Sequence, residues 1–233
     1  RFNPAAEKQP FRCVYTSSPD RGLHLLLGLW PKIVAREPAA ELHVAYGWQG
    51  FEAMAGHRPD LAALRATLEA QMAALPSVHW PGRLPQQQLA GLYDSAWAWL
   101  YPSDFLEVSC IASVEAMAAG AVPVCSASGA LKETVAEGGY VVPGSVYSRA
   151  WQEFYLHCVH ATLGELSTRK VKEYAGRERA KGLTWDVAYQ QHWRPLVERL
   201  LTGPSPADRA AMAALAATIT TSPQPKREPA GVA

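Results

Sequence analysis

The chain has 233 residues, 48% of them hydrophobic, and a formal net charge of +1. This length and apolar content fit one globular domain with a full core and exclude an intrinsically disordered chain. Acidic and basic residues are interspersed rather than gathered into a basic stripe, so the composition gives no support for a nucleic-acid partner. The sequence contains no run of about 18 apolar residues, so no transmembrane helix is predicted.

The four cysteines form no C-x-x-C pair and no zinc-ligand pattern. They are Cys13, Cys110, Cys125 and Cys158. Reduced and buried thiols in a cytoplasmic protein are the expected state. The sequence shows no signal peptide and begins at Arg1 rather than Met, so we expect it to be a piece of a longer polypeptide.

Short runs of β-forming residues alternate with longer segments that carry apolar residues at helical spacing. In chain order, the prediction starts with a linker at 1–10, a strand at 11–16, a helix at 21–36, a strand at 41–46, a helix at 59–75, a strand at 78–81, a helix at 85–95 and a strand at 96–101. Pro31 is expected to kink the first helix.

The second half of the chain continues this alternation and then becomes helical. The predicted elements are a helix at 110–119, a strand at 122–126, a helix at 129–137, a strand at 140–142 and helices at 149–164, 167–181 and 185–201. Residues 202–233 are rich in Pro, Ala, Ser and Thr and are predicted to be mostly disordered, with helical potential at 207–218.

This alternation predicts an α/β fold in which helices cover both faces of a parallel sheet. We predict a doubly wound, Rossmann-like sheet of six parallel strands in the order 3-2-1-4-5-6, in a domain spanning 11–201 with C-terminal helices. Such sheets bind ligands where the strand order reverses, beyond the carboxyl ends of the first and fourth strands. The loops that meet there are 17–22 and 103–110.

The first loop leads into a predicted helix and contains Ser17, Ser18, Arg21 and Gly22. Helix starts present free backbone N–H groups and a positive dipole end, which suit a phosphate. Arg21 adds a planar cation that can bind phosphate through two hydrogen bonds. An ordinary strand-to-helix turn with a surface arginine explains the loop equally well.

Two acids frame the second loop. Glu107 precedes a predicted helix, and Glu115 lies inside it among apolar residues. Two helical positions eight residues apart point about 80° away from each other, so a loop position for Glu107 lets both acids face one ligand. A carboxylate among apolar residues needs partners, and ligand hydroxyls would serve. The alternative is that both are solvated surface acids.

The segment FLEVSCIASVEAMAAGAVPV resembles the E-x7-E signature of retaining GT-B glycosyltransferases, family 4 in particular. The sequence keeps Glu107, Glu115, Ala116, Gly120, Pro123 and Val124 of that signature. The loop and helix at 15–27 and the helices up to 201 are also similar to this family. The resemblance implies that the chain is one half of a GT-B fold, the C-terminal half that binds the nucleotide sugar.

The resemblance also implies roles for individual residues. Glu115 would bind the ribose hydroxyls and Glu107 the hydroxyls of the donor sugar, while Arg21 would neutralise charge on the leaving diphosphate. Other expected donor contacts are Ser17, Ser18, Gly22, Arg83, Ser109, Cys110 and Ile111, with Arg83 near the base. Neither a metal nor another cofactor is required.

One position departs from the family pattern. The family often has a second arginine where this chain has Ser17 or Ser18, so hydroxyls, Lys132 or Arg83 would have to serve instead, or phosphate binding is weaker. We expect the donor domain of a retaining hexosyltransferase-type enzyme, incomplete without an amino-terminal acceptor domain outside this chain. A non-catalytic nucleotide-sugar-binding or scaffolding module is the alternative, and a GT-B-like epimerase is less favoured.

The histidine and tryptophan residues predict no separate site. The histidines are scattered, and His157 and His160, three apart on a predicted helix, lack an acidic or Cys ligand nearby. Six tryptophans fall on predicted apolar faces, which favours core packing over sugar stacking. They are Trp30, Trp97, Trp99, Trp151, Trp185 and Trp193.

Overall fold

A computed structural model describes residues 2–3, 5–48 and 59–221. The chain divides into two compact units, Arg1–Leu183 and Thr184–Ala233, which we describe separately. Within the second unit the helices contact one another. The domain end at 201 stays a prediction. None of the described helices is long and apolar enough to cross a membrane.

The first unit is built on a six-stranded parallel sheet in the order β3-β2-β1-β4-β5-β6, as predicted. The strands are β1 Arg12–Tyr15, β2 Glu41–Val44, β3 Val78–His79, β4 Ala98–Tyr101, β5 Val122–Ser126 and β6 Tyr140–Val142. Every residue of β4 and β5 is buried, which explains their continuous apolar sequences. The strand order reverses between β1 and β4.

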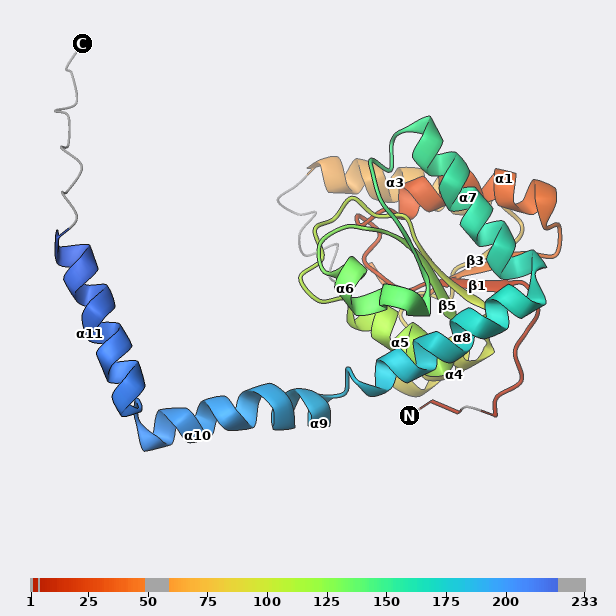
Figure 1. Cartoon of the computed structure of the whole chain (residues 1–233). Coiled ribbons are helices and arrows are strands. Elements are labelled where there is room, and N and C mark those ends of the chain that lie inside the picture. The colour runs from red at the N-terminus through yellow and green to blue at the C-terminus, as the bar shows by residue number, and fades with distance from the viewer. Residues whose placement is uncertain (1, 4, 49–58, 222–233) are drawn as a thin grey trace, which may run out of the picture. The chain divides into compact units, whose positions relative to one another are not determined.

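Helices cover both faces of this sheet (Figure 1). One layer contains α1 Leu23–Arg36, α3 Pro59–Ala73 and α7 Arg149–Gly164, and the other contains α4 Gln86–Ser95, α5 Ile111–Ala119 and α8 Leu166–Lys181. The short α6 Leu131–Val135 and a 3-10 turn at Ala136–Gly138 precede β6. The α1 helix continues through Pro31, and the kink expected there stays a prediction.

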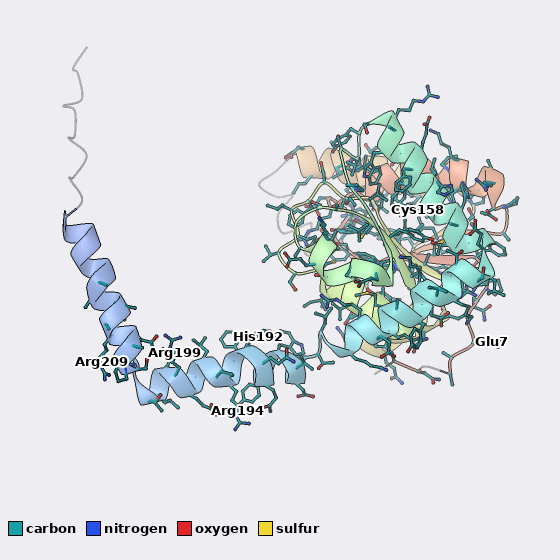
Figure 2. All side chains as sticks on the ribbon, in the orientation of Figure 1. Glu7, Cys158, His192, Arg194, Arg199 and Arg209 are labelled. Atoms are coloured by element: carbon teal, nitrogen blue, oxygen red, sulfur yellow. The ribbon has the colours of Figure 1, made fainter. Side chains whose placement is uncertain are left out.

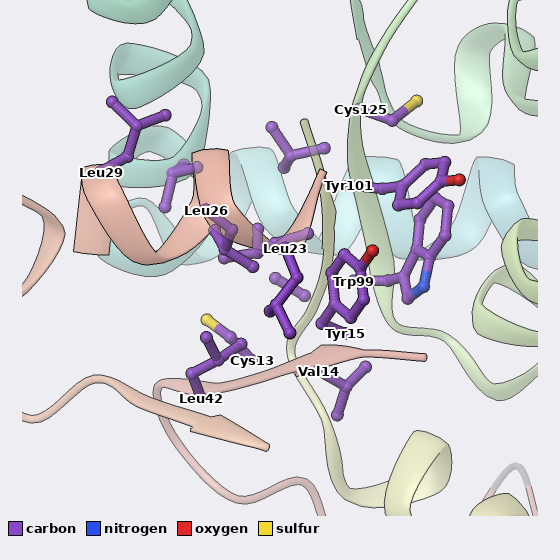
Figure 3. Close-up of a cluster of buried hydrophobic side chains, with 14 of the residues drawn as sticks. Cys13, Val14, Tyr15, Leu23, Leu26, Leu29, Leu42, Trp99, Tyr101 and Cys125 are labelled. Atoms are coloured by element: carbon purple, nitrogen blue, oxygen red, sulfur yellow. The ribbon is translucent and has the colours of Figure 1, made fainter. Parts of the chain in front are cut away.

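Aromatic rings from the two central strands fill the core below the strand ends (Figure 3). The Trp99 and Tyr101 rings stack with centroids 4.9 Å apart, and the Tyr15 ring lies 5.9 Å from that of Tyr101. All three side chains are fully buried. This packing fixes the Tyr101 ring at the carboxyl end of β4, where a ligand site is predicted.

Two residues of the predicted amino-terminal linker form hydrogen bonds with the rest of the first unit. The Asn3 amide donates to the Asp94 carboxylate at 3.0 Å. The ammonium group of Lys8 donates to the carbonyls of Ala96 and Ala119 at 2.8 and 2.9 Å, and its burial lowers the pKa of Lys8 to about 8. These long-range bonds join the segment to α4 and to the end of α5.

The second unit is helical over most of its described residues, including part of the tail that is predicted to be mostly disordered. It contains α9 Trp185–Ala188, a π turn at Tyr189–Trp193, α10 Arg194–Thr202 and α11 Pro206–Thr221, while residues 222–233 lie outside the described part. A reciprocal cap starts α11, because the Ser205 amide donates to Asp208 and the Asp208 amide donates to the Ser205 hydroxyl, both at 3.1 Å. The α11 helix covers the stretch 207–218, for which the sequence indicates helical potential.

The helices of the second unit leave large aromatic residues exposed. Trp185 is 80% exposed and Trp193 57% exposed, so core packing was the wrong prediction for these two, whereas Trp30 and Trp99 are buried. On α10, Arg194 forms an ion pair with Glu198 at 2.8 Å. Arg194 is labelled in Figure 2.

Candidate functional site

The two loops predicted to face one another meet at Gly22. The β1 strand ends at Tyr15 and α1 begins at Leu23, so the loop between them spans 16–22. Gly22 has a φ of +103°, and a Cβ added there would lie 2.1 Å from the carbonyl oxygen of Pro102. Since Pro102 directly follows β4, the backbones of both loops touch where the strand order reverses. Glycine permits both the conformation and the close approach.

Hydrogen bonds within the first loop shape its backbone at the start of α1. The Tyr15 hydroxyl donates to the Ser18 carbonyl at 2.7 Å, and the Arg21 amide donates to the same carbonyl at 3.0 Å. The Ser18 hydroxyl donates to the Asp20 carboxylate. Because Gly22 at the start of α1 touches Pro102, the positive end of the α1 dipole lies beside the loop that follows β4. This arrangement favours an anion.

Glu107 lies in the loop before α5, as predicted, and is only 6% exposed. The Tyr101 hydroxyl donates to Glu107 Oε1 at 2.6 Å, and the Ser17 hydroxyl donates to the Tyr101 oxygen at 3.3 Å. Burial and the bond to Glu107 raise the pKa of Tyr101 well above its ordinary value, so the phenol stays neutral. Ser17 thus contacts Tyr101, and through it supports the Glu107 carboxylate.

The guanidinium group of Arg21 lies between this carboxylate and an aromatic ring. Its Nη1 atom is 3.6 Å from Glu107 Oε1, and its central carbon lies 3.9 Å from the centroid of the Phe105 ring. The first distance is longer than a hydrogen bond, so Arg21 keeps donors available for another acceptor. The side chain is 36% exposed, and an incoming anion can reach it.

A third loop, the one after β5, contacts the backbone around Glu107. The Ala130 amide donates to the Glu107 carbonyl at 2.8 Å, and the Ser128 hydroxyl donates to the Phe105 carbonyl at 2.6 Å. Gly129 has a φ of +58°, and a Cβ there would lie 2.1 Å from the Glu107 carbonyl oxygen. The loop after β5 therefore fixes the backbone that carries the acid.

Glu115 lies within α5 and is half-buried, so the predicted division of the acids between loop and helix is confirmed. The helix begins after Cys110, which is buried and makes no side-chain cap. Burial raises the pKa of Cys110 to about 11, so its thiol is neutral and only its backbone remains for a ligand. Ser109 and Ile111 on either side are exposed.

Arg83 lies at a cavity of about 330 Å³ next to the first loop. The lining comes from the ends of β1 and β2, the loop after β3 and the start of α4. The lining residues are Thr16, Ala45, Tyr46, Gly47, Arg83, Leu84, Gln86 and Leu89. The predicted base-binding role of Arg83 is compatible with this position and stays a prediction. Lys132, the other substitute cation, is exposed on α6.

Sequence reasoning missed three residues that shape the site: Tyr101, Phe105 and Gly129. Tyr101 was predicted only as the last residue of a buried strand, although a phenol at the end of a central parallel strand is placed to bond a residue in the following loop. Phe105 carried no signal of its stacking on Arg21. The contact between Gly129 and Glu107 depends on two loops that only the folded sheet brings together.

Replacing Tyr101 by Phe is expected to lower the free energy of unfolding by about 1–3 kcal/mol, the scale for losing a hydrogen bond to a buried charged group. The ring would still stack on Trp99, so the fold should persist. Urea denaturation of the full chain measures the change, with the exposed Tyr174→Phe as the matched control. Equal stability of both variants would show that the bond to Glu107 contributes nothing.

Comparisons with known proteins find a matching family model and solved structures of similar fold. The model of the family described as glycosyl transferases group 1 matches residues 3–153. The pneumococcal O-GlcNAc transferase GtfA, solved with UDP and GlcNAc, aligns with a TM-score of 0.67 and 15% identity over 87% of this chain and 38% of that chain. No curated protein matches the sequence.

Two further solved structures share the fold. Anabaena HepE, in complex with UDP-glucose, has a TM-score of 0.62 and 19% identity over 82% of this chain and 49% of that chain. Sucrose-phosphate synthase from Thermosynechococcus elongatus has a TM-score of 0.65 and 20% identity over 82% of this chain and 46% of that chain. At these identities the likeness is one of fold, and this chain spans less than half the length of each of the three structures.

Proposed function

Because this chain belongs to the glycosyl transferases group 1 family, we propose that its first unit binds the nucleotide-diphosphate sugar donor of a retaining, hexosyltransferase-type glycosyltransferase. The observation that carries the proposal is the Arg21 guanidinium, held 3.6 Å from the buried Glu107 carboxylate, at the point where Gly22 brings the two central loops into contact. A cation, a helix start and a buried acid together match a diphosphate that carries a sugar.

The diphosphate would lie at the start of α1. Its oxygens would accept hydrogen bonds from Arg21 and from backbone amides of the loops next to Gly22 and Ser109. Sugar transfer breaks the bond between the anomeric carbon and a diphosphate oxygen, and negative charge then grows on the leaving group. Arg21 is placed to stabilise that charge, which supports electrostatic catalysis without a metal ion. No other cofactor enters this proposal.

The two acids would bind the two sugars of the donor. Glu107, fixed by Tyr101 and the loop at Gly129, would accept hydrogen bonds from hydroxyls of the transferred sugar. Glu115 on α5 would accept hydrogen bonds from the ribose. The base would enter the cavity lined by Arg83. UDP and UDP-glucose in the solved relatives make uridine nucleotides the first donors to test.

The acceptor would bind to a domain outside this sequence, since the chain spans only 38–49% of the three solved structures. The isolated chain is therefore proposed to bind the donor in the cytoplasm but to need that domain for transfer. A non-catalytic binding module is the second candidate. It is favoured by Ser17 and Ser18, which occupy the place of a second cation and are bonded to Tyr101 and Asp20.

Glu115→Gln is expected to weaken the binding of UDP about 5- to 30-fold, because the amide keeps one acceptor oxygen but loses the charge that strengthens hydrogen bonds to ribose hydroxyls. Calorimetric titration of the full chain measures the affinity. Glu153→Gln, an exposed acid on α7, is the matched control and should bind like the unmodified chain. Unchanged affinity in Glu115→Gln would show that this residue does not bind the ribose.

A further inference from the structure

Three potential metal ligands meet away from the Arg21–Glu107 site, at the edge of the sheet formed by β2 and β3. Glu41 and His43 are two residues apart in β2, so their side chains lie on the same face of the sheet. His79 in β3 pairs in register with His43. The two imidazole rings have centroids 4.9 Å apart at an interplanar angle of 39°. Strand pairing thus gathers groups that the sequence separates.

The distances between these groups fit a small metal ion. Glu41 Oε2 lies 3.4 Å from His43 Nε2, and one ligand atom from each of the three residues lies within 4.8 Å of the others. Tetrahedral Zn²⁺ with bonds of about 2.0–2.2 Å holds its ligand atoms about 3.3–3.6 Å apart. The Glu41–His43 pair already has that spacing. The His79 side chain is exposed, so rotation of its ring can complete the set.

The cluster is open to an ion from solvent. The Glu41 side chain is 46% exposed and that of His43 is 18% exposed, while His79 is exposed. Arg12 is the neighbouring cation: its Nη2 atom is 3.8 Å from Glu41 Oε2, and its Nη1 atom donates to the Ser95 hydroxyl at 3.1 Å. The Arg12–Glu41 distance exceeds a hydrogen bond, so the carboxylate remains available to a metal.

We propose that Glu41, His43 and His79 bind a divalent transition-metal ion, with Zn²⁺ as the best match, and leave a fourth position for water. Two imidazoles and one carboxylate suit Zn²⁺, Co²⁺ or Ni²⁺, whereas Mg²⁺ and Ca²⁺ prefer oxygen ligands alone. The site is separate from the proposed donor site, and it does not depend on nucleotide binding.

Metal binding has a structural consequence for the sheet. The β3 strand contains only Val78 and His79 and lies at the sheet edge, where pairing is weakest. A metal shared by His43 and His79 would tie β3 to β2. The loop after β3 carries Arg83 and the cavity wall, so the ion would also steady that wall. Slower hydrogen exchange of the β3 amides in the presence of Zn²⁺ is the expected sign.

Titration of the chelator-treated full chain with ZnCl₂ alone tests the proposal. The expected result is one ion per chain, an affinity at least about tenfold lower in His43→Gln and in His79→Gln, and unchanged binding in the controls His157→Gln and His192→Gln. His192 lies in the second unit, far along the sequence from the cluster (Figure 2). Co²⁺ in place of Zn²⁺ should give the intense visible absorption of a tetrahedral site.

A substitution of Arg12, the cation that competes with the metal for Glu41, adds a second test. Arg12→Gln removes the charge next to Glu41 and should tighten Zn²⁺ binding, whereas a purely structural role for these residues predicts no gain. Absence of Zn²⁺ binding, or equal binding by the chain and by His79→Gln, would overturn the proposal and leave an ion-pair cluster only. Since no nucleotide is present, either outcome is independent of the donor-binding proposal.

Discussion

Gly22→Ala is expected to lower the free energy of unfolding by about 2–5 kcal/mol, which combines the strain of a left-handed backbone with overpacking against a fixed neighbour. The new Cβ would lie 2.1 Å from the Pro102 carbonyl oxygen at a φ of +103°. The clash is with backbone, so no side-chain rotation relieves it. The two loops must move apart, which would also separate the start of α1 from Glu107.

Denaturation by guanidinium chloride and calorimetric titration with UDP measure the two effects of this substitution. Gly28→Ala is the matched control, because Gly28 lies in the same helix and a methyl group there would have nothing within 4 Å. It should raise stability by about 0.5–1 kcal/mol, as expected for alanine replacing glycine within a helix. If Gly22→Ala were as stable as Gly28→Ala and bound UDP normally, the loop contact would have no importance.

Arg21→Ala is expected to weaken the binding of UDP about 10- to 150-fold, the range for losing hydrogen bonds between a cation and a phosphate. Uridine should bind the variant almost as well as the unmodified chain, because the nucleoside has no phosphate for Arg21 to contact. Arg21→Lys should recover only part of the loss, since an ammonium group keeps the charge but cannot donate as a planar fork or stack on Phe105 in the same way.

The loss of UDP affinity in Arg21→Ala, compared with the loss of uridine affinity, decides the role of Arg21. Arg149→Ala removes an arginine from the exposed surface of α7 and controls for the change in net charge. The loss of UDP affinity should also shrink at high salt, because screening weakens the contribution of a partly exposed cation. Equal losses for UDP and uridine would contradict a phosphate role and would point to a distorted loop.

Much of the fold follows from patterns within short segments. Continuous apolar runs such as those at 98–101 and 122–126 predict fully buried parallel strands, and the alternation with helices predicts the strand order. The positions of Glu107 in a loop and Glu115 in a helix follow from local sequence and from Gly120, which ends α5 in a left-handed conformation.

Contacts between residues far apart in the sequence could not be predicted from such local patterns. The bond from Tyr101 to Glu107 and the approach of Gly129 depend on how three loops pack once the sheet has formed. The proximity of His43 and His79 depends on strand register, which the sequence alone left unspecified. In the tail, the local cap at Ser205 and Asp208 starts α11, which covers the stretch 207–218 where the sequence indicates helical potential.

We propose that this chain binds a nucleotide-diphosphate sugar where β1 and β4 end. Calorimetric titration of the full chain with UDP-, GDP- and ADP-sugars tests it most directly, with Arg21→Ala as the matched variant. We expect binding of at least one of these donors with one site per chain, and a clear loss of affinity for that donor in Arg21→Ala. Absence of binding heat with all three, at temperatures chosen to exclude a zero enthalpy, would contradict it.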